Sequence, residues 1–133
     1  MNHNNYCIQK TETQWLEELG DEKYQILRKK GTERPFTGIY NLHKENGIYS
    51  CAACKTQLFT SDAKFNSGCG WPSFDQAIEG PVEYIKDKTF GMVRTEILCA
   101  TCGSHLGHVF DDGPTPSGQR YCVNSLSLDF QKK

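Results

Sequence analysis

Four of the seven cysteines form two matched pairs, each with two residues between its members. The first pair lies in CAACKTQL and the second in CATCGSHL, and each segment has a leucine four residues after its second cysteine. This spacing lets both sulfurs of a pair point to one side of a tight turn, as a tetrahedral zinc site requires. A redox-active disulfide is the alternative for either pair alone, but two matching pairs favour one zinc ion. Its ligands would be Cys51, Cys54, Cys99 and Cys102.

A zinc ion held by four thiolates has a complete coordination shell, with no open position for water or substrate. We therefore expect this metal to be structural and to join parts of the chain that are distant in sequence. Any chemistry must then come from other residues, and three cysteines remain: Cys7, Cys69 and Cys122.

Cys122 lies in RYCVNS, where polar and apolar residues alternate as in a strand. Side chains two apart in a strand share a face, so Arg120, Cys122 and Asn124 are expected to project together. A neighbouring guanidinium favours the thiolate, which is the nucleophilic form of cysteine. A buried cysteine that acts only as a small apolar side chain is the alternative. Cys69 lies in the glycine-rich segment SGCGWPSF, which predicts a loop that can move.

The segment HLGHVFDDG supplies two histidines, His105 and His108, directly after the second cysteine pair. Imidazole is the usual proton donor near neutral pH, so either could act as a general acid; a purely structural histidine is the alternative for each. Asp112 could orient one of them. Trp71, in a Gly-Trp-Pro turn, is either a core aromatic or an exposed wall for an apolar ligand group.

These residues need a scaffold, and the sequence predicts short N-terminal helices followed by an antiparallel β domain. Residues 1–10 are expected to be loose, 11–30 helical and 35–130 a zinc-stapled β core, all within a single domain 1–133. The sequence TETQ predicts a capping box at the start of the helical region. TGIYNLHKENGIYSC predicts a hairpin, because Asn-Gly is a preferred two-residue turn. Further strands are predicted near 82–85 and 93–97, and one alternating strand over 120–130.

Composition narrows the possible partners and location. The chain has 15 basic and 16 acidic side chains and a net charge of −1, so no overall electrostatic attraction to nucleic acid or membrane is expected. The N-terminus lacks the apolar run of a secretory signal, and no segment approaches transmembrane length. A cytoplasmic location is therefore expected, and in such a reducing compartment clustered cysteines favour metal binding or catalysis.

The motifs SGCGWPSF, HLGHVFDDGP and RYCVNS, with the two C-x-x-C pairs in this order, closely resemble the methionine-R-sulfoxide reductase B family. The resemblance covers roughly residues 31–130. It implies a β-rich fold of two antiparallel sheets, called a β-tent, and one structural Zn²⁺. It also implies reduction of methionine-R-sulfoxide, free or in oxidised proteins, with thioredoxin as the reductant. The chain would act as a monomer, without a nucleic-acid or membrane partner.

The resemblance also implies a role for each matching residue. Cys122 corresponds to the nucleophile that becomes a sulfenic acid, and Cys69 to the resolving cysteine that then forms a Cys69–Cys122 disulfide. Trp71 corresponds to the aromatic residue that packs against the methyl group of the substrate. The residues that surround the sulfoxide oxygen or support the site would be His105, His108, Asn124, Arg120 and Asp112.

Two other functions remain open at this point. A zinc-knuckle module that only binds a protein explains the four paired cysteines, but it gives no role to Cys69 and Cys122. A related zinc-dependent thiol enzyme could act on a different small adduct. A zinc hydrolase or deaminase is disfavoured, because neither histidine is followed by the glutamate that such sites use as acid and base.

Overall fold

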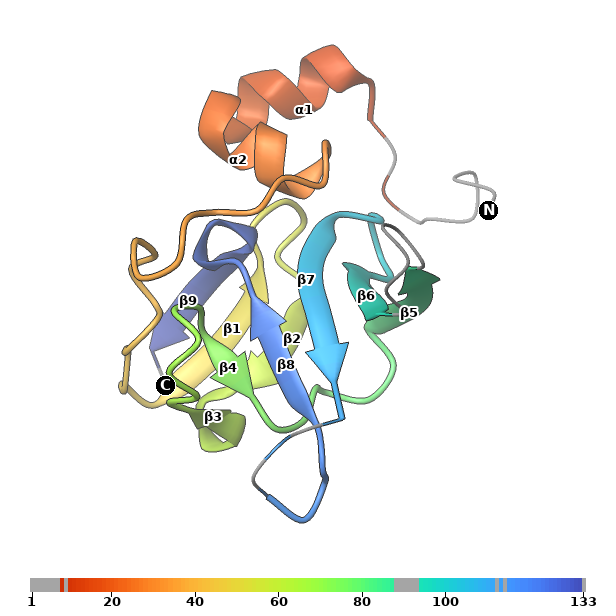
Figure 1. Ribbon diagram of the computed structural model, residues 1–133. Coiled ribbons are helices and arrows are strands. Elements are labelled where there is room, and N and C mark those ends of the chain that lie inside the picture. The colour runs from red at the N-terminus through yellow and green to blue at the C-terminus, as the bar shows by residue number, and fades with distance from the viewer. Residues whose placement is uncertain (1–7, 9, 88–93, 112, 114, 133) are drawn as a thin grey trace.

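The computed structural model describes the chain apart from residues 1–7, 9, 88–93, 112, 114 and 133. The described part contains two short helices followed by nine strands (Figure 1). The helices are α1 (Glu12–Leu19) and α2 (Asp21–Leu27). The strands are β1 (Gly47–Cys51), β2 (Gln57–Thr60), β3 (Lys64–Phe65), β4 (Ser73–Phe74), β5 (Val82–Asp87), β6 (Arg94–Cys99), β7 (His105–Phe110), β8 (Arg120–Val123) and β9 (Leu128–Lys132).

The first helix begins at the predicted capping box. The Thr11 side chain accepts a hydrogen bond from the Gln14 N–H at 3.2 Å, and the Gln14 side chain accepts one from the Thr11 N–H at 2.9 Å. Gly20, with a φ of 82°, separates α1 from α2. The helices lie together at one end of the β structure (Figure 1), with Trp15 and Leu27 buried. Neither has the length and apolar character needed to cross a membrane.

The strands form two antiparallel sheets, so the predicted fold class is confirmed. One sheet has three strands in the order β2-β1-β9, and the other has six in the order β3-β4-β8-β7-β6-β5. Strands β8 and β7 are central in the larger sheet, where Cys122 lies opposite His108. The register therefore places the histidine-containing strand β7 beside the strand β8 that contains Cys122.

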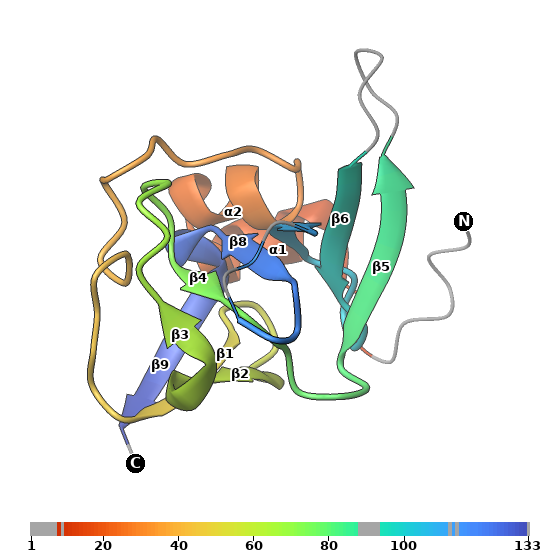
Figure 2. The same ribbon diagram turned by 60° about the horizontal axis from the view of Figure 1, so that its bottom comes forward.

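Buried aromatic side chains join the two sheets. Phe59 of β2 stacks on Phe74 of β4 with ring centroids 4.3 Å apart, and Tyr49 of β1 meets Phe74 edge-on at 5.2 Å. Tyr121 of β8 contacts Phe59 at 5.7 Å. All four rings are at most 3 % exposed, and such pairs contribute about 0.5–1.5 kcal/mol beyond the burial of their area. This packing holds β8 and β4 against the smaller sheet (Figure 2).

Two strand predictions were wrong. Residues 37–46 form no strand, and the hairpin partner of β1 is β2, so that the turn follows Cys51 and contains Cys54 in place of Asn46-Gly47. The predicted strand over 120–130 is divided into β8 and β9 by a 3-10 turn (Ser125–Ser127), which moves the chain from one sheet to the other. A single alternating pattern thus covers two strands in different sheets.

Candidate active site and metal centre

The four paired cysteines converge into one cluster. Their sulfur atoms all lie within 4.8 Å of one another, with 3.7 Å between Cys51 and Cys102 and 3.5 Å between Cys54 and Cys99. A tetrahedral zinc site with Zn–S bonds of about 2.3 Å has sulfur–sulfur edges of about 3.8 Å. The cluster therefore fits a tetrathiolate zinc ion in both donor type and size.

This cluster connects the two sheets. Cys51 ends β1 and Cys54 lies in the turn before β2, whereas Cys99 ends β6 and Cys102 lies in the turn before β7. Two hairpins from different sheets are thus joined through their turns. Arg28, just after α2, adds a contact from the helices, because its Nη1 donates to the Cys102 carbonyl at 2.9 Å.

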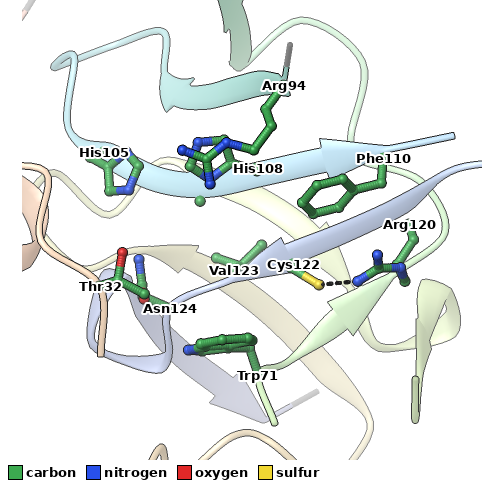
Figure 3. Close-up of a pocket in the computed structure, with 11 residues that line it drawn as sticks. Thr32, Trp71, Arg94, His105, His108, Phe110, Arg120, Cys122, Val123 and Asn124 are labelled. Atoms are coloured by element: carbon green, nitrogen blue, oxygen red, sulfur yellow. Dashed lines mark hydrogen bonds between the residues drawn. The ribbon is translucent and has the colours of Figure 1, made fainter. Parts of the chain in front are cut away.

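A separate cavity of about 300 Å³ opens beside the central strands of the larger sheet. Figure 3 shows Trp71 on one side of Cys122 and the β7 side chains His108 and Phe110 on the other. The sequence-predicted residues Trp71, His105, His108, Arg120, Cys122 and Asn124 all line it. The remaining lining residues are Thr32, Arg94, Gly107, Phe110 and Val123.

Arg120 and Cys122 interact directly in this pocket. The Arg120 Nη1 donates to the Cys122 Sγ at 2.8 Å, a bond drawn in Figure 3. The guanidinium also lies 4.5 Å from the centroid of the Phe110 ring, a cation–π distance that restricts its position. The strand periodicity therefore placed this cation beside this thiol correctly.

Cys69 lies against Cys122 although the two are far apart in sequence. Their sulfur atoms are 3.2 Å apart, and both are free thiols in this structure. The Ser67 hydroxyl contacts the Cys69 sulfur at 2.9 Å and the Ser73 hydroxyl contacts it at 3.4 Å. A disulfide bond of about 2.05 Å therefore needs only a small further approach of the two sulfurs.

The contact between the two sulfurs shifts the pKa values of Cys69 and Cys122 in opposite directions. The hydrogen bond from Cys122 lowers the pKa of Cys69 to about 4, outweighing the opposing effect of burial. The same hydrogen bond, together with burial and the charge on Cys69, raises the pKa of Cys122, and the positive charge of Arg120 opposes this rise. Separation of the two sulfurs would remove the contact that raises the pKa of Cys122 and leave the Arg120 guanidinium, which favours the Cys122 thiolate.

Glu33 links Trp71 to Asn124. The Trp71 indole Nε1 donates to the Glu33 carbonyl at 3.0 Å, and the Glu33 N–H donates to the Asn124 Oδ1 at 3.1 Å. The Glu33 carboxylate accepts a further bond from the Leu126 N–H at 3.0 Å, and burial raises its pKa. Because Trp71 lines the pocket, it is not solely a core aromatic. No sequence motif indicated Glu33, because its partners lie far along the chain.

A bulge in β7 brings the two histidines to the same pocket. Residues three apart in a regular strand point to opposite faces, but the β6–β7 register shifts between Ile97 and Leu98, which places one extra residue in β7. The His105 and His108 rings are 5.8 Å apart between centroids and meet edge-on. His105 also binds the buried carboxylate of Glu96 at 2.7 Å, a partner that the sequence analysis did not identify. Asp112 lies outside the described residues.

Gly107, between the histidines, has no room for a side chain. A Cβ there would fall on the carbonyl group of Cys122 and come within 3.0 Å of the Val123 Cα. We expect Gly107→Ala to lower the free energy of unfolding by about 1–3 kcal/mol, as overpacking typically does, and to slow any reaction at Cys122. Urea denaturation and single-turnover assays would measure both effects.

Gly118→Ala is a suitable control for this substitution. A Cβ at Gly118 would meet open space, so the change costs only the strain of its φ of 71°, about 1–2 kcal/mol, and should leave the chemistry unchanged. Equal activity losses in the two variants would contradict a specific steric requirement at Gly107.

Comparisons with known proteins identify the family of this chain. A family model described as the SelR domain matches residues 19–132. The protein named peptide methionine sulfoxide reductase MsrB from Thiobacillus denitrificans is 59% identical over 125 residues, covering 93% of this chain and 95% of that protein. The protein of that name from Leptospira interrogans is 55% identical over 130 residues, covering 97% and 99% of the two chains.

A structural likeness extends to a more distant protein. The crystal structure of the Mis18 "Yippee-like" domain matches with a TM-score of 0.54 at 17% identity, over 67% of this chain and 98% of that one. At this identity the likeness concerns the fold alone. The matches to the SelR-domain model and to the proteins named as reductases extend over most of the chain and establish its family. This chain belongs to the SelR-domain family.

Proposed function

We propose that this protein reduces methionine-R-sulfoxide, free or in oxidised proteins, to methionine through a sulfenic acid at Cys122. The observation that carries the proposal is the contact of the Cys122 sulfur with both Arg120 and Cys69 beside a pocket lined by Trp71 and two histidines. The relatives named as peptide methionine sulfoxide reductases support the same reaction class. A zinc-knuckle binding module would need neither the paired thiols nor the pocket.

The first step is an attack on the sulfoxide sulfur. Movement of the Cys69 loop removes the hydrogen bond and the charge that hold the proton on Cys122, while Arg120 remains to stabilise the Cys122 thiolate. The thiolate then attacks sulfur as a proton is transferred to the sulfoxide oxygen from His105 or His108. The oxygen passes to Cys122 as a sulfenic acid, and methionine leaves with its sulfur reduced.

The second half of the reaction restores the two thiols. The Cys69 thiolate attacks the sulfenic sulfur, a Cys69–Cys122 disulfide forms, and the oxygen leaves as water after protonation. The thioredoxin dithiol then reduces this disulfide and becomes a disulfide itself. In this scheme Trp71 contacts the substrate methyl group, and Asn124 contributes to the polar surroundings of the oxygen together with Arg120 and Asp112.

One zinc ion held by the four paired cysteines stabilises this scaffold and takes no part in the reaction. The residues fit that ion in donor type and spacing. We infer a single catalytic domain that acts as a monomer in the cytoplasm, where thioredoxin and oxidised proteins are both present. Reduction of methionine sulfoxide there would make the protein a repair enzyme under oxidative stress.

The proposal predicts a strict preference for one sulfur epimer. Trp71 and the histidines lie on opposite sides of Cys122 (Figure 3), so the methyl group and the oxygen each have one matching position. Purified protein incubated with dithiothreitol and each epimer should release methionine only from the R form, as measured by chromatography. Comparable rates with the S form would contradict the stereochemical assignment. Release from neither epimer by folded protein would favour the binding module.

A further inference from the structure

A buried glutamate lies directly behind the pocket. Glu96 of β6 is 5 % exposed, and its Oε2 is 2.7 Å from the Nδ1 of His105, which is itself 3 % exposed. Its other oxygen accepts a hydrogen bond from Lys30 at 3.2 Å. The carboxylate thus has a partner for each oxygen, although it does not itself line the pocket.

Glu96 is ionised despite its burial. Burial alone would raise the pKa of this carboxyl group, but the hydrogen bonds and positive charges of His105 and Lys30 outweigh burial and lower its pKa. An ionised carboxylate only accepts hydrogen bonds. The His105 Nδ1 must therefore carry the hydrogen of the 2.7 Å bond, in the neutral ring as well as in the charged one.

This bond decides which nitrogen of His105 can exchange a proton. With Nδ1 committed to Glu96, Nε2 is the remaining nitrogen, and the structure gives it no hydrogen-bond partner among the described residues. The ring lines the pocket, so a proton on Nε2 is available to a molecule bound there. The same logic applies to the aspartate of a catalytic triad, which holds the tautomer and orientation of its histidine.

We propose that Glu96 is a positioning residue that holds His105 through Nδ1, so that His105 delivers its proton from Nε2 to the oxygen of the substrate. This inference rests on the proposed function and deepens it by assigning the proton donor. The Nε2 proton moves to the sulfoxide oxygen as the Cys122 thiolate attacks sulfur. The ring is left neutral with its Nδ1–H on Glu96, and solvent restores the Nε2 proton.

Two substitutions of Glu96 separate this role from a general effect on folding. Glu96→Gln keeps the length of the side chain, but the amide can also donate a hydrogen bond and so permits the wrong tautomer of His105. Glu96→Asp keeps a group that only accepts, although its reach is shorter. We expect methionine release in a single turnover to fall roughly 10–100-fold in Glu96→Gln, the size of effect typical for loss of the carboxylate that orients a metal-binding histidine, and to fall less in Glu96→Asp.

The spectroscopic readout is the ¹⁵N spectrum of the His105 ring, assigned by comparison with His105→Ala. The wild-type ring, when neutral, should show a protonated Nδ1, and Glu96→Gln should lose this pattern. Asp129→Asn is the matched control, because it removes a carboxylate from an exposed pair with Lys55 and should change neither the rate nor the spectrum. Zinc content and melting temperature establish that each variant is folded.

Three results would overturn the inference: a Glu96→Gln rate within twofold of wild type, a Glu96→Asp rate below that of Glu96→Gln, or a wild-type Nδ1 without a proton in the neutral ring. The last test needs no variant, so it holds even if a substitution prevents folding. Failure of the proposed function is a different observation, namely that wild-type protein releases no methionine from the R epimer.

Discussion

Cys122→Ser should release no methionine at all, whereas Cys69→Ser should release about one methionine per enzyme and then stop. A serine hydroxyl at position 122 is not ionised near neutral pH without an adjacent base. In the proposed scheme the pocket histidine donates a proton to the sulfoxide oxygen and does not take one from position 122. Removal of Cys69 leaves both the thiolate attack and the proton transfer intact. It also removes the hydrogen-bond partner that raises the pKa of Cys122, so the first turnover should be at least as fast as in wild type.

The two variants should also differ in which reductant, if any, restores their turnover. Cys69→Ser has no internal partner for the Cys122 sulfenic acid, so thioredoxin should not restore turnover, whereas a small thiol that enters the pocket should restore part of it. A rapid-quench assay without reductant, followed by a thiol count, measures the burst. Cys7→Ser is the control, since our scheme assigns that thiol no role. A full burst from Cys122→Ser, or none from folded Cys69→Ser, would reverse or refute the assignment of the two cysteines.

Local signals in the sequence predicted much of this arrangement. The capping box at Thr11, the four metal-site cysteines and the adjacency of Arg120 and Cys122 all depend on residues close together in the chain or on matched spacing. Strand periodicity requires only that side chains two apart share a face. Such features can be predicted without knowing the topology, and the structure has each of them.

Contacts between distant segments could not be predicted in this way. Residues 37–45 were predicted to form one strand of a hairpin with an Asn46-Gly47 turn. The path of this segment instead depends on long-range bonds, such as that from the Phe36 N–H to the Gly70 carbonyl at 2.7 Å. Tyr40 is likewise held by the Ser125 hydroxyl at 3.2 Å. These bonds depend on the tertiary fold, which outweighs local preference.

The supporting carboxylates of the site were missed for related reasons. Glu33 acts largely through its main chain, whose N–H and carbonyl bind Asn124 and Trp71, and main-chain groups have no signature in a sequence. Glu96 reaches His105 across a bulge between β6 and β7, and a regular strand register would not suggest that pair. Glu96 directly follows the polar residues Arg94 and Thr95 in RTEILC, so no local pattern distinguishes it from an exposed glutamate.

We expect substitution of a cysteine in the metal centre to have the largest effect on the stability of the fold. Cys51 is fully buried and Cys102 is 1 % exposed, so Cys51→Ser or Cys102→Ser would leave a broken donor set in the interior. Structural zinc contributes its binding free energy to folding, with apparent values of about 10–16 kcal/mol in small zinc domains at pH 7, which is comparable to the whole stability of a domain of this size. Each variant should lose its zinc and most of its folded population at 37 °C.

Loss of activity should follow from this loss of structure. The cluster joins the β1–β2 turn to the β6–β7 turn, and β7 carries both histidines of the pocket. Metal analysis of the purified protein, a thermal melt and the R-epimer assay test the three effects together. Cys69→Ser is the matched control, because it removes a cysteine outside the cluster and should keep one zinc per chain and the wild-type melting temperature. A Cys51→Ser protein that is metal-free, equally stable and fully active would show that the four thiols have no structural metal role.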